Sequence, residues 1–546
     1  MSEIVLFTGV NNMIGFCRYA GTYRLATELR DAGFTVQTVD FFGEMSPKNV
    51  HRVIDAHVGE ETLWVGISTT LMQKYLSDEE EDEFWTAGTN IDLNLVQKNT
   101  DLYGEFMPYD EIDMQEIFKH IKANNSKTQI VVGGYKALAY GKPWNGVDYW
   151  IAGQGEGPSV ALSKHLKFNT PLQVIDCYLG KILTDKMYPF SKFNNARIKW
   201  HESDHILPNE DLPIEFARGC IFKCSFCAFP LNGKKFGDYT RGMDSLRDEL
   251  IYNYENFGTT GYMVSDDTIN DSLKKVQYLH DVFTSLPFKA RLTGYLRLDI
   301  IEANPQMISM LKEIGMSSVN FGIETFNQKT GKIIGKGADP EKLKKCLYRL
   351  NKEWGDDVFV GTNFIIGLPE ESKESIRRTF EWLHQDDVPV HQMNMTKLYI
   401  AQYPTRIDKP DLITEDQMQR YGFVKSRIGQ WEYSTTSKIQ DNPEDYNINF
   451  GDEHWWKWTS EYMTEDEAQQ LSDEFYTNPK NRHKKQNFVY PYSRLVNMGY
   501  KKEEILKLDR TDVPTLMKLL KETRKLRDEY VEKVCTHKTI RSPRFN

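Results

Sequence analysis

Short apolar runs alternate with stretches of helical spacing along the first 165 residues. Runs of about four to eight apolar residues are typical of buried strands, and apolar residues that recur every three or four positions are typical of helices. Strands are expected at 3–10, 34–42, 62–69, 128–134 and 147–153, and helices at 21–33, 47–57 and 114–125. Strands separated by helices predict a doubly wound parallel sheet, a Rossmann-like α/β domain. An acidic stretch at 76–85 is expected to begin a surface insertion.

A second alternating series starts near Leu212. Its expected strands are 212–220, 261–267, 290–298, 317–325, 358–367 and 390–400, with helices at 245–257, 304–315 and 340–354. This series predicts a full or partial β/α barrel of the TIM type, in which residues at the carboxyl ends of the strands carry the chemistry.

From about Asp411 the pattern becomes mostly helical. A Thr464…Glu467 capping box starts one helix, and residues 514–534 form a long one. We therefore expect an α/β chain of four segments: a sheet domain at 1–165, a connector at 166–204, a barrel at 205–410 and a helical region at 411–546.

Composition and charge narrow the class of protein. The chain has 546 residues, of which 40% are hydrophobic, so a folded protein of more than one domain is expected. No apolar run approaches the ~18 residues of a membrane span, and the first residues lack the features of a signal peptide, so we expect a cytoplasmic protein. The net charge of −10 disfavours general nucleic-acid binding. Residues 480–546 carry 18 Lys+Arg against 8 Asp+Glu, which keeps nucleic acid as a possible partner, although a solvated helical face is the preferred interpretation.

Three of the seven cysteines, Cys220, Cys224 and Cys227, lie within eight residues after an expected strand. An odd count with one tight cluster indicates a metal or cofactor site in a reducing compartment, not a disulfide framework. Structural zinc requires four closed ligands, and His205 and His280 are poorly placed to supply the fourth. Three thiolates on a 4Fe–4S cubane leave one iron open to a chelating ligand, which favours a reactive centre. A non-catalytic binding module with a structural metal cluster remains the alternative of a different class.

This cysteine spacing, preceded by "ARG" and with Phe226 before the last cysteine, resembles that of the radical S-adenosylmethionine (SAM) superfamily. The resemblance implies that SAM binds the open iron through its amino and carboxylate groups. One electron, from a donor such as flavodoxin or ferredoxin, then cleaves SAM to a 5′-deoxyadenosyl radical. It also implies that Phe226 lies near the adenine.

Further segments resemble the same superfamily at the ends of successive strands. The resemblance makes Asp266 and Asp267 candidates for the SAM amino group, and Arg297 for its carboxylate. Glu324 is implied at the ribose or amino end, and Gly367 at the adenine, where a glycine allows close backbone approach. Each acid and the arginine can equally form a structural ion pair.

The first domain resembles the cobalamin-binding domain of the cobalamin-dependent radical SAM class. The similarity lies in residues 21–42, in "VGIST" with Ser68, in "GGYKA" with Gly133 and Gly134, and in "GQGEGP" with Gly155 and Glu156. It implies that these loops run close to a corrin. One departure is the lack of Asp-x-His-x-x-Gly after the first strand. "DAHVGE" has its Gly one residue early and follows the second helix, so we interpret His57 as an ordinary helix-end residue.

The function that this resemblance implies is a cobalamin-dependent methyltransferase acting on an unactivated carbon or phosphorus of an unidentified small-molecule or carrier-bound substrate. Tyr399 and the Tyr403–Pro404 segment are candidates for the substrate pocket. "HWWKW" at 454–458 is a candidate to stack on a planar substrate, with core or lid packing preferred.

The alternative enzyme is a radical SAM oxidoreductase, cyclase or sulfur-inserting enzyme without bound cobalamin. Methylthiotransferases, which share the layout, usually carry three further cysteines in the first domain. Only Cys17 and Cys177 are available for that purpose here, which disfavours this branch.

Overall fold

The computed structural model describes most of the expected elements. The described residues are 2–8, 18–42, 45–68, 114–134, 146–177, 180–190, 193–208, 210–227, 239–398, 400, 415–430, 436–438, 447–449, 454–478, 480, 500–507 and 513–536. The predicted acidic insertion, Cys17, Tyr399 and the Tyr403–Pro404 segment lie outside these ranges. No helix in the described ranges combines the length and apolar character that crossing a membrane requires.

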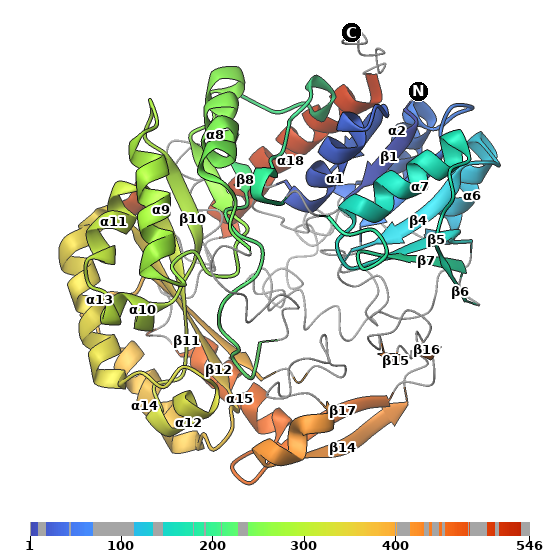
Figure 1. Ribbon diagram of the computed structural model, residues 1–546. Helices are drawn as coiled ribbons and strands as arrows, with labels where there is room; N and C mark the ends of the chain where they lie inside the picture. The colour runs from blue at the N-terminus through green and yellow to red at the C-terminus, as the bar shows by residue number, and fades with distance from the viewer. Residues whose placement is uncertain are drawn as a thin grey trace.

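The first part of the chain forms a seven-stranded sheet, as the predicted α/β pattern requires (Figure 1). Its order is β2 (Val36–Val39), β1 (Ile4–Phe7), β3 (Trp64–Ser68), β4 (Gln129–Gly133), β5 (Tyr149–Ala152), β7 (Gly180–Thr184) and β6 (Ile175–Cys177). All neighbouring strands are parallel except β6 and β7. The sequence pattern did not predict β6 and β7, which lie within the expected connector.

Alternation along the strands divides the apolar residues of this sheet between two layers of helices. Ile4 and Leu6 of β1 face one core with α1 (Ala20–Asp31) and α7 (Glu156–Phe168). Val5 and Phe7 face the other core with α2 (Pro47–His57) and α6 (Met114–Asn124). A strand that is buried on both faces reads as a continuous apolar run, which is why the pattern in this part was informative.

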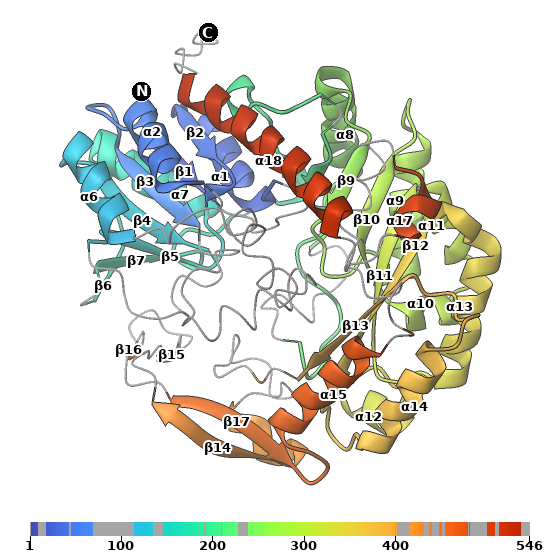
Figure 2. The same cartoon turned by 180° about the vertical axis from the view of Figure 1, so that it is seen from behind.

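The long helix α18 (Val513–Thr536) packs on this first sheet, beside α2 (Figure 2). Tyr530 is fully buried, and its hydroxyl accepts a hydrogen bond from the backbone N–H of Asp40 at 2.9 Å. Val534 completes the contact, since its carbonyl oxygen lies 2.8 Å from Nε2 of His57. His57 is the last residue of α2, so its interpretation as an ordinary helix-end residue is confirmed.

The second part forms a six-stranded parallel sheet, which confirms the predicted barrel in its partial form. The order is β8 (Leu212–Ile214), β9 (Gly261–Val264), β10 (Arg291–Leu296), β11 (Met316–Glu324), β12 (Phe359–Ile366) and β13 (Gln392–Lys397). The helices of this part are α8 (Met243–Phe257), α9 (Leu273–Thr284), α10 (Leu298–Ala303), α11 (Met307–Glu313), α12 (Gln328–Ile333), α13 (Pro340–Trp354) and α14 (Lys373–Leu383). They lie along the outer side of the curved sheet in both views (Figures 1 and 2).

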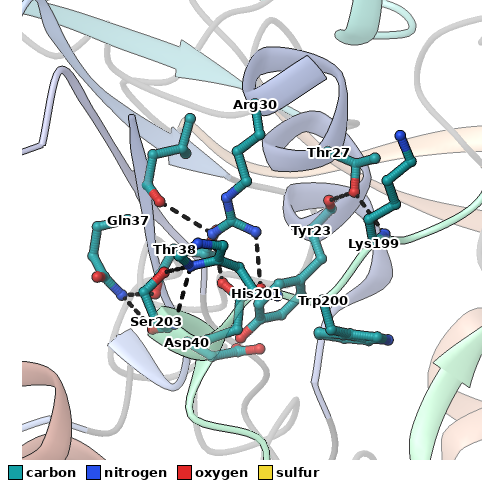
Figure 3. Close-up of polar contacts among 12 residues, drawn as sticks. Tyr23, Thr27, Arg30, Gln37, Thr38, Asp40, Lys199, Trp200, His201 and Ser203 are labelled. Carbon is teal, nitrogen blue, oxygen red and sulfur yellow. Dashed lines mark hydrogen bonds and ion pairs between the residues drawn. The ribbon is translucent and has the colours of Figure 1, made fainter. Parts of the chain in front are cut away.

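The segment that leads into β8 is bound along the first domain (Figure 3). Arg30 of α1 donates two hydrogen bonds to the carboxylate of Asp204, at 2.7 and 2.9 Å. Gln37 of β2 donates to the carbonyl oxygen of Ser203, and Thr27 accepts from the backbone of Lys199. These bonds fix the start of the second sheet against the first.

The third part contains more strand than the sequence predicted. β14 (Phe423–Gln430) pairs antiparallel with β17 (His454–Ser460), and β15 (Thr436–Lys438) with β16 (Asn447–Asn449). α15 (Glu465–Thr477) packs against β13, and α17 (Lys502–Lys507) precedes α18. The predicted capping box at Thr464 and Glu467 is present and starts α15.

Candidate active site

The three clustered cysteines lie on the loop that follows β8, at the carboxyl end of the first barrel strand. Cys220 and Cys224 are buried, each with 8% of its surface exposed, and Cys227 is half-buried. Burial raises the pKa of the Cys220 thiol. A hydrogen bond with the Thr268 hydroxyl, at 3.7 Å, lowers this pKa and partly offsets the rise. Among the described residues no three His, Cys, Asp or Glu side chains converge closely enough to hold one metal ion. Thiolates on a cubane bind separate irons, so three spaced thiols on one loop suit an iron–sulfur cluster.

The backbone before Cys220 is held from two directions. The backbone N–H groups of Phe216 and Ala217 both donate to Oδ1 of Asp266, at 2.7 and 3.1 Å. On the other side, the N–H of Arg218 donates to the carbonyl oxygen of Tyr239 at 2.8 Å. The cluster loop, residues 215–227, therefore starts from a fixed backbone.

Asp266 also forms a buried ion pair with Lys275 of α9. The two side chains are fully buried, and Oδ2 of Asp266 lies 2.8 Å from Nζ of Lys275. Asp271 lies 3.6 Å from the same ammonium and accepts a hydrogen bond from the Tyr239 hydroxyl. Burial raises the pKa of both carboxyls, and Lys275 opposes that rise. Asp266 therefore forms the structural ion pair that the sequence analysis kept as an alternative to SAM binding. Its contact with SAM remains a prediction.

Asp267 is half-buried and follows directly. Its negative charge contributes to the raised pKa of Cys220. Its predicted role toward the SAM amino group is untested.

Arg297, which follows β10, reaches the cluster loop. Its Nη1 lies 3.3 Å from Sγ of Cys224, and its guanidinium carbon lies 3.7 Å from the ring centre of Phe222. The same guanidinium makes two hydrogen bonds to Asp299, at 3.0 and 2.5 Å. Burial alone would lower the pKa of Arg297, but Asp299 outweighs it and raises the pKa. Arg297 therefore places a positive charge beside Cys224. Its predicted contact with the SAM carboxylate remains a prediction.

Glu324 ends β11 in a strained conformation. It has a left-handed φ of 70°, which is uncommon outside glycine and concentrates at functional sites. Its carboxylate lies 2.9 Å from Nζ of Lys336, and that ammonium lies 5.6 Å from the ring centre of Phe226. Glu324 ends β11, and Phe226 lies on the loop after β8. The structure brings both close to Lys336, which the sequence reasoning did not single out. Lys336 lies in the segment "GKIIGKG" at 331–337, shortly after Glu324, but spacing alone gave no reason to choose it.

Gly367, at the end of β12, has a left-handed φ of 90°. A Cβ there would lie only 2.3 Å from Cη2 of Trp458. Trp458 is 2% exposed, and its Nε1 donates to the carbonyl oxygen of Leu398 at 2.9 Å. The preferred interpretation of Trp458 as a core residue is confirmed. The described contacts of Gly367 are with this indole, so its predicted contact with adenine remains a prediction.

The predicted cofactor loops of the first domain lie at the carboxyl edge of its sheet. Ser68 ends β3 and pairs in register with Gly133, which ends β4. Gly134 follows with a left-handed φ of 103°. These positions are the ones where ligands of doubly wound sheets bind.

Gly155 lies in the loop between β5 and α7, Glu156 is the first residue of α7, and protein contacts surround both. A Cβ on Gly155 would lie 3.1 Å from Leu25, so packing gives a reason for the glycine. Glu156 is 4% exposed, and its Oε1 accepts a hydrogen bond from Nη1 of Arg218 at 2.7 Å. The first sheet and the cluster loop are therefore in direct contact.

The sequence of the chain is similar to known proteins over part of its length. A family model described as Radical SAM superfamily matches residues 214–383. Over 185 residues the chain is 26% identical to an uncharacterized methyltransferase of Pyrococcus horikoshii, a match covering 34% of this chain and 39% of the relative. It is 24% identical over 177 residues to the anaerobic magnesium-protoporphyrin IX monomethyl ester cyclase of Cereibacter sphaeroides, covering 32% of this chain and 28% of that one. The matched part thus spans well under half the length of these two relatives.

A solved structure has the same overall fold. It is that of the radical S-adenosylmethionine methyltransferase TsrM from Kitasatospora setae, described with cobalamin and a [4Fe-4S] cluster bound. It superposes with a TM-score of 0.62 at 15% identity, over 96% of this chain and 100% of that one. At this identity the likeness shows that the two proteins share a fold.

Proposed function

This chain belongs, through residues 214–383, to the radical SAM superfamily, and we propose that it is a cobalamin-dependent methyltransferase that acts on an unactivated carbon or phosphorus. It is a radical SAM enzyme, for which the superfamily implies a 4Fe–4S cluster and SAM. The observation that carries the finer proposal is the contact between the first domain and the cluster loop. Glu156, at the carboxyl edge where a corrin would bind, touches Arg218 of the loop that carries the thiols.

The residues present fit the two groups of the barrel. Cys220, Cys224 and Cys227 would hold the cluster, because they are three thiols on one loop with a guanidinium 3.3 Å from one of them. When bound, the cluster with SAM supplies one-electron cleavage of the sulfonium, and cobalamin supplies a methyl carrier.

The chain's own part is to bind, orient and exclude water. The burial of Cys220 and Cys224 keeps water from the thiols. The carboxylate of Glu324 is placed to accept hydrogen bonds from a ribose or an ammonium, and Phe226 offers an apolar face beside it. Lys336 holds the Glu324 carboxylate in one orientation, since it also donates to the carbonyl oxygen of Gly322.

In the first domain, Ser68, Gly133 and Gly134 would lie against a corrin. They end adjacent strands, and the glycines leave room for close backbone approach. The sequence after β1 has no Asp-x-His-x-x-Gly motif, so these loop residues are the ones that would hold a corrin. The full-length likeness in fold to TsrM, whose structure is described with cobalamin bound, supports a cobalamin site in this chain.

We propose that the substrate is a small or carrier-bound molecule. A flavodoxin or ferredoxin would supply electrons to the enzyme. The second candidate is a radical SAM cyclase or oxidoreductase without bound cobalamin. The sequence similarity to the magnesium-protoporphyrin cyclase favours the cyclase form of this candidate.

Anaerobic reconstitution with iron, sulfide and hydroxocobalamin tests both candidates. Desalted protein is expected to hold about four irons and to retain cobalt with a corrin absorption spectrum. With SAM and a reductant it is expected to form 5′-deoxyadenosine. Iron without cobalt would overturn the cobalamin proposal in favour of the second candidate, and zinc without iron would overturn both. A Cys220→Ser variant, which should lose most of its iron, serves as the control for specific loading.

A further inference from the structure

Arg218 joins the cluster loop to the first sheet. It stands two residues before Cys220, and its Nη1 donates to Oε1 of Glu156 at 2.7 Å and to Oε1 of Gln154 at 3.2 Å. Its Nε and Nη2 make a two-point contact with Glu215, at 2.8 and 2.9 Å. All three guanidinium nitrogens are therefore engaged, and a planar donor set of this kind fixes orientation as well as distance.

The partner on the first sheet is itself rigid. Glu156 is the first residue of α7, where the partial positive charge of a helix start favours a carboxylate. Just before it, Gly153 has a left-handed φ of 84°, and the N–H of Gln154 donates to Asp185 at 3.1 Å. Just after it, a Cβ on Gly157 would lie 1.9 Å from the carbonyl oxygen of Tyr188. The loop that presents Glu156 therefore has almost no freedom to move.

The barrel holds the other side of Arg218. Its own N–H donates to the carbonyl oxygen of Tyr239, and the two residues before it are bound to Asp266. One residue thus has its backbone fixed by the barrel and its side chain fixed by the first domain. The two partners Glu156 and Arg218 lie 62 residues apart in the sequence.

We propose that Arg218 is a positioning residue that, through Glu156, sets where the cluster loop stands relative to the carboxyl edge of the first sheet. Its ion pair couples the loop that carries the three thiols to the domain that would hold the second cofactor. The coupling to that cofactor rests on the proposed function. The positioning of the thiols does not, because it involves only the cluster loop and α7.

The test uses full-length protein reconstituted with iron and sulfide, without cobalamin, so that it is independent of cobalt binding. Glu156→Gln, Arg218→Lys and the double variant are compared with Arg377→Lys on α14, which alters an exposed pair with Glu474 of α15. Iron content and thermal midpoint first establish that each variant folds and loads. The readouts are the electron paramagnetic resonance spectrum of the reduced cluster with and without SAM, its midpoint potential, and hydrogen exchange of residues 215–227.

We expect both single variants to keep their iron but to shift the spectrum and the potential. Exchange of the 215–227 amides should quicken about tenfold, as the loss of a charge-assisted hydrogen bond implies. The double variant should change little more than either single one, because each removes the same contact. Unchanged spectra and exchange in both single variants would overturn the proposal. A change in Arg218→Lys alone would also overturn it, since Glu215 and not the first sheet would then hold the arginine.

Discussion

Replacing Glu371 by Gln should make this protein more stable at neutral pH. Glu371 lies in the loop between β12 and α14 and is only 3% exposed. Its Oε1 accepts a hydrogen bond from the Thr325 hydroxyl at 2.5 Å, and its Oε2 is buried with no hydrogen-bond partner. Burial raises the pKa of Glu371 from 4.5 to about 8, which the hydrogen bonds from Thr325 and the backbone only partly offset. The folded protein therefore carries a proton on this group at neutral pH.

The size of the effect follows from linkage. Between pH 4.5 and about 8 the folded state holds a proton that the unfolded chain releases. The stability that this group contributes is therefore complete below pH 4.5 and is lost as the pH rises. Each pH unit in that window lowers the free energy of unfolding by about 1.4 kcal/mol, which amounts to about 3 kcal/mol by pH 7. Glutamine keeps the shape of the protonated side chain and has no proton to lose.

The assay is the thermal midpoint of the variant minus that of the parent at a series of pH values from 5 to 8. Other groups titrate alike in both proteins and cancel in this difference. The difference should grow with pH and reach roughly 5 °C or more at pH 8, given the usual conversion of a change in the free energy of unfolding into a shift of the thermal midpoint for a protein of this size. The buried amide adds an offset that does not vary with pH. Glu381→Gln, at an exposed site on the same α14, should show no trend. A difference for E371Q that stays flat across the range would refute the reasoning.

Three further substitutions test contacts described above. Lys275→Met leaves two buried carboxylates without their cation, so it should cost about 3–5 kcal/mol of stability and reduce iron loading. Unfolding experiments and iron content measure these two effects, and a stable, fully loaded variant would contradict the prediction. Gly367→Ala should lower the thermal midpoint, because its Cβ would lie 2.3 Å from Trp458 in a left-handed backbone, and an unchanged midpoint would show that the indole can give way. Tyr530→Phe leaves the N–H of Asp40 buried without an acceptor and should cost about 1–3 kcal/mol, seen as faster hydrogen exchange in α18. Equal exchange in variant and parent would show that this hydrogen bond does not hold α18 in place.

The strands of both main sheets could be predicted because burial on both faces leaves a local mark. β1 reads as a continuous apolar run, β12 as apolar residues on both sides of Thr362 and Asn363, and each lies inside the expected range. β6 and β7 were missed because neither reads as an apolar run: β6 is Ile-Asp-Cys, and β7 begins with Gly180 and Lys181. β17 was missed because its alternation of Trp with polar residues is short, and its partner β14 lies far back in the chain.

The site divides in the same way. The cysteine spacing is local, so the sequence alone pointed to it. The partners of the neighbouring charges are not local. Asp266 meets Lys275 from the next helix, and Glu156 meets Arg218 from another domain. Sequence reasoning could name these residues as charged and well placed, but only the folded chain shows which opposite charge each one faces.

The packing of α18 on the first sheet has a consequence for how the chain is made. The hydrogen bond between Asp40 and Tyr530 joins residues 490 positions apart. At about 5–20 residues per second, the ribosome needs roughly 25–100 s to synthesise the chain between them. During that interval α18 does not yet cover Phe41 and the side of α2 on which it later packs. The first sheet is thus made long before the helix that covers it, and a chaperone that shields this face would act before α18 packs.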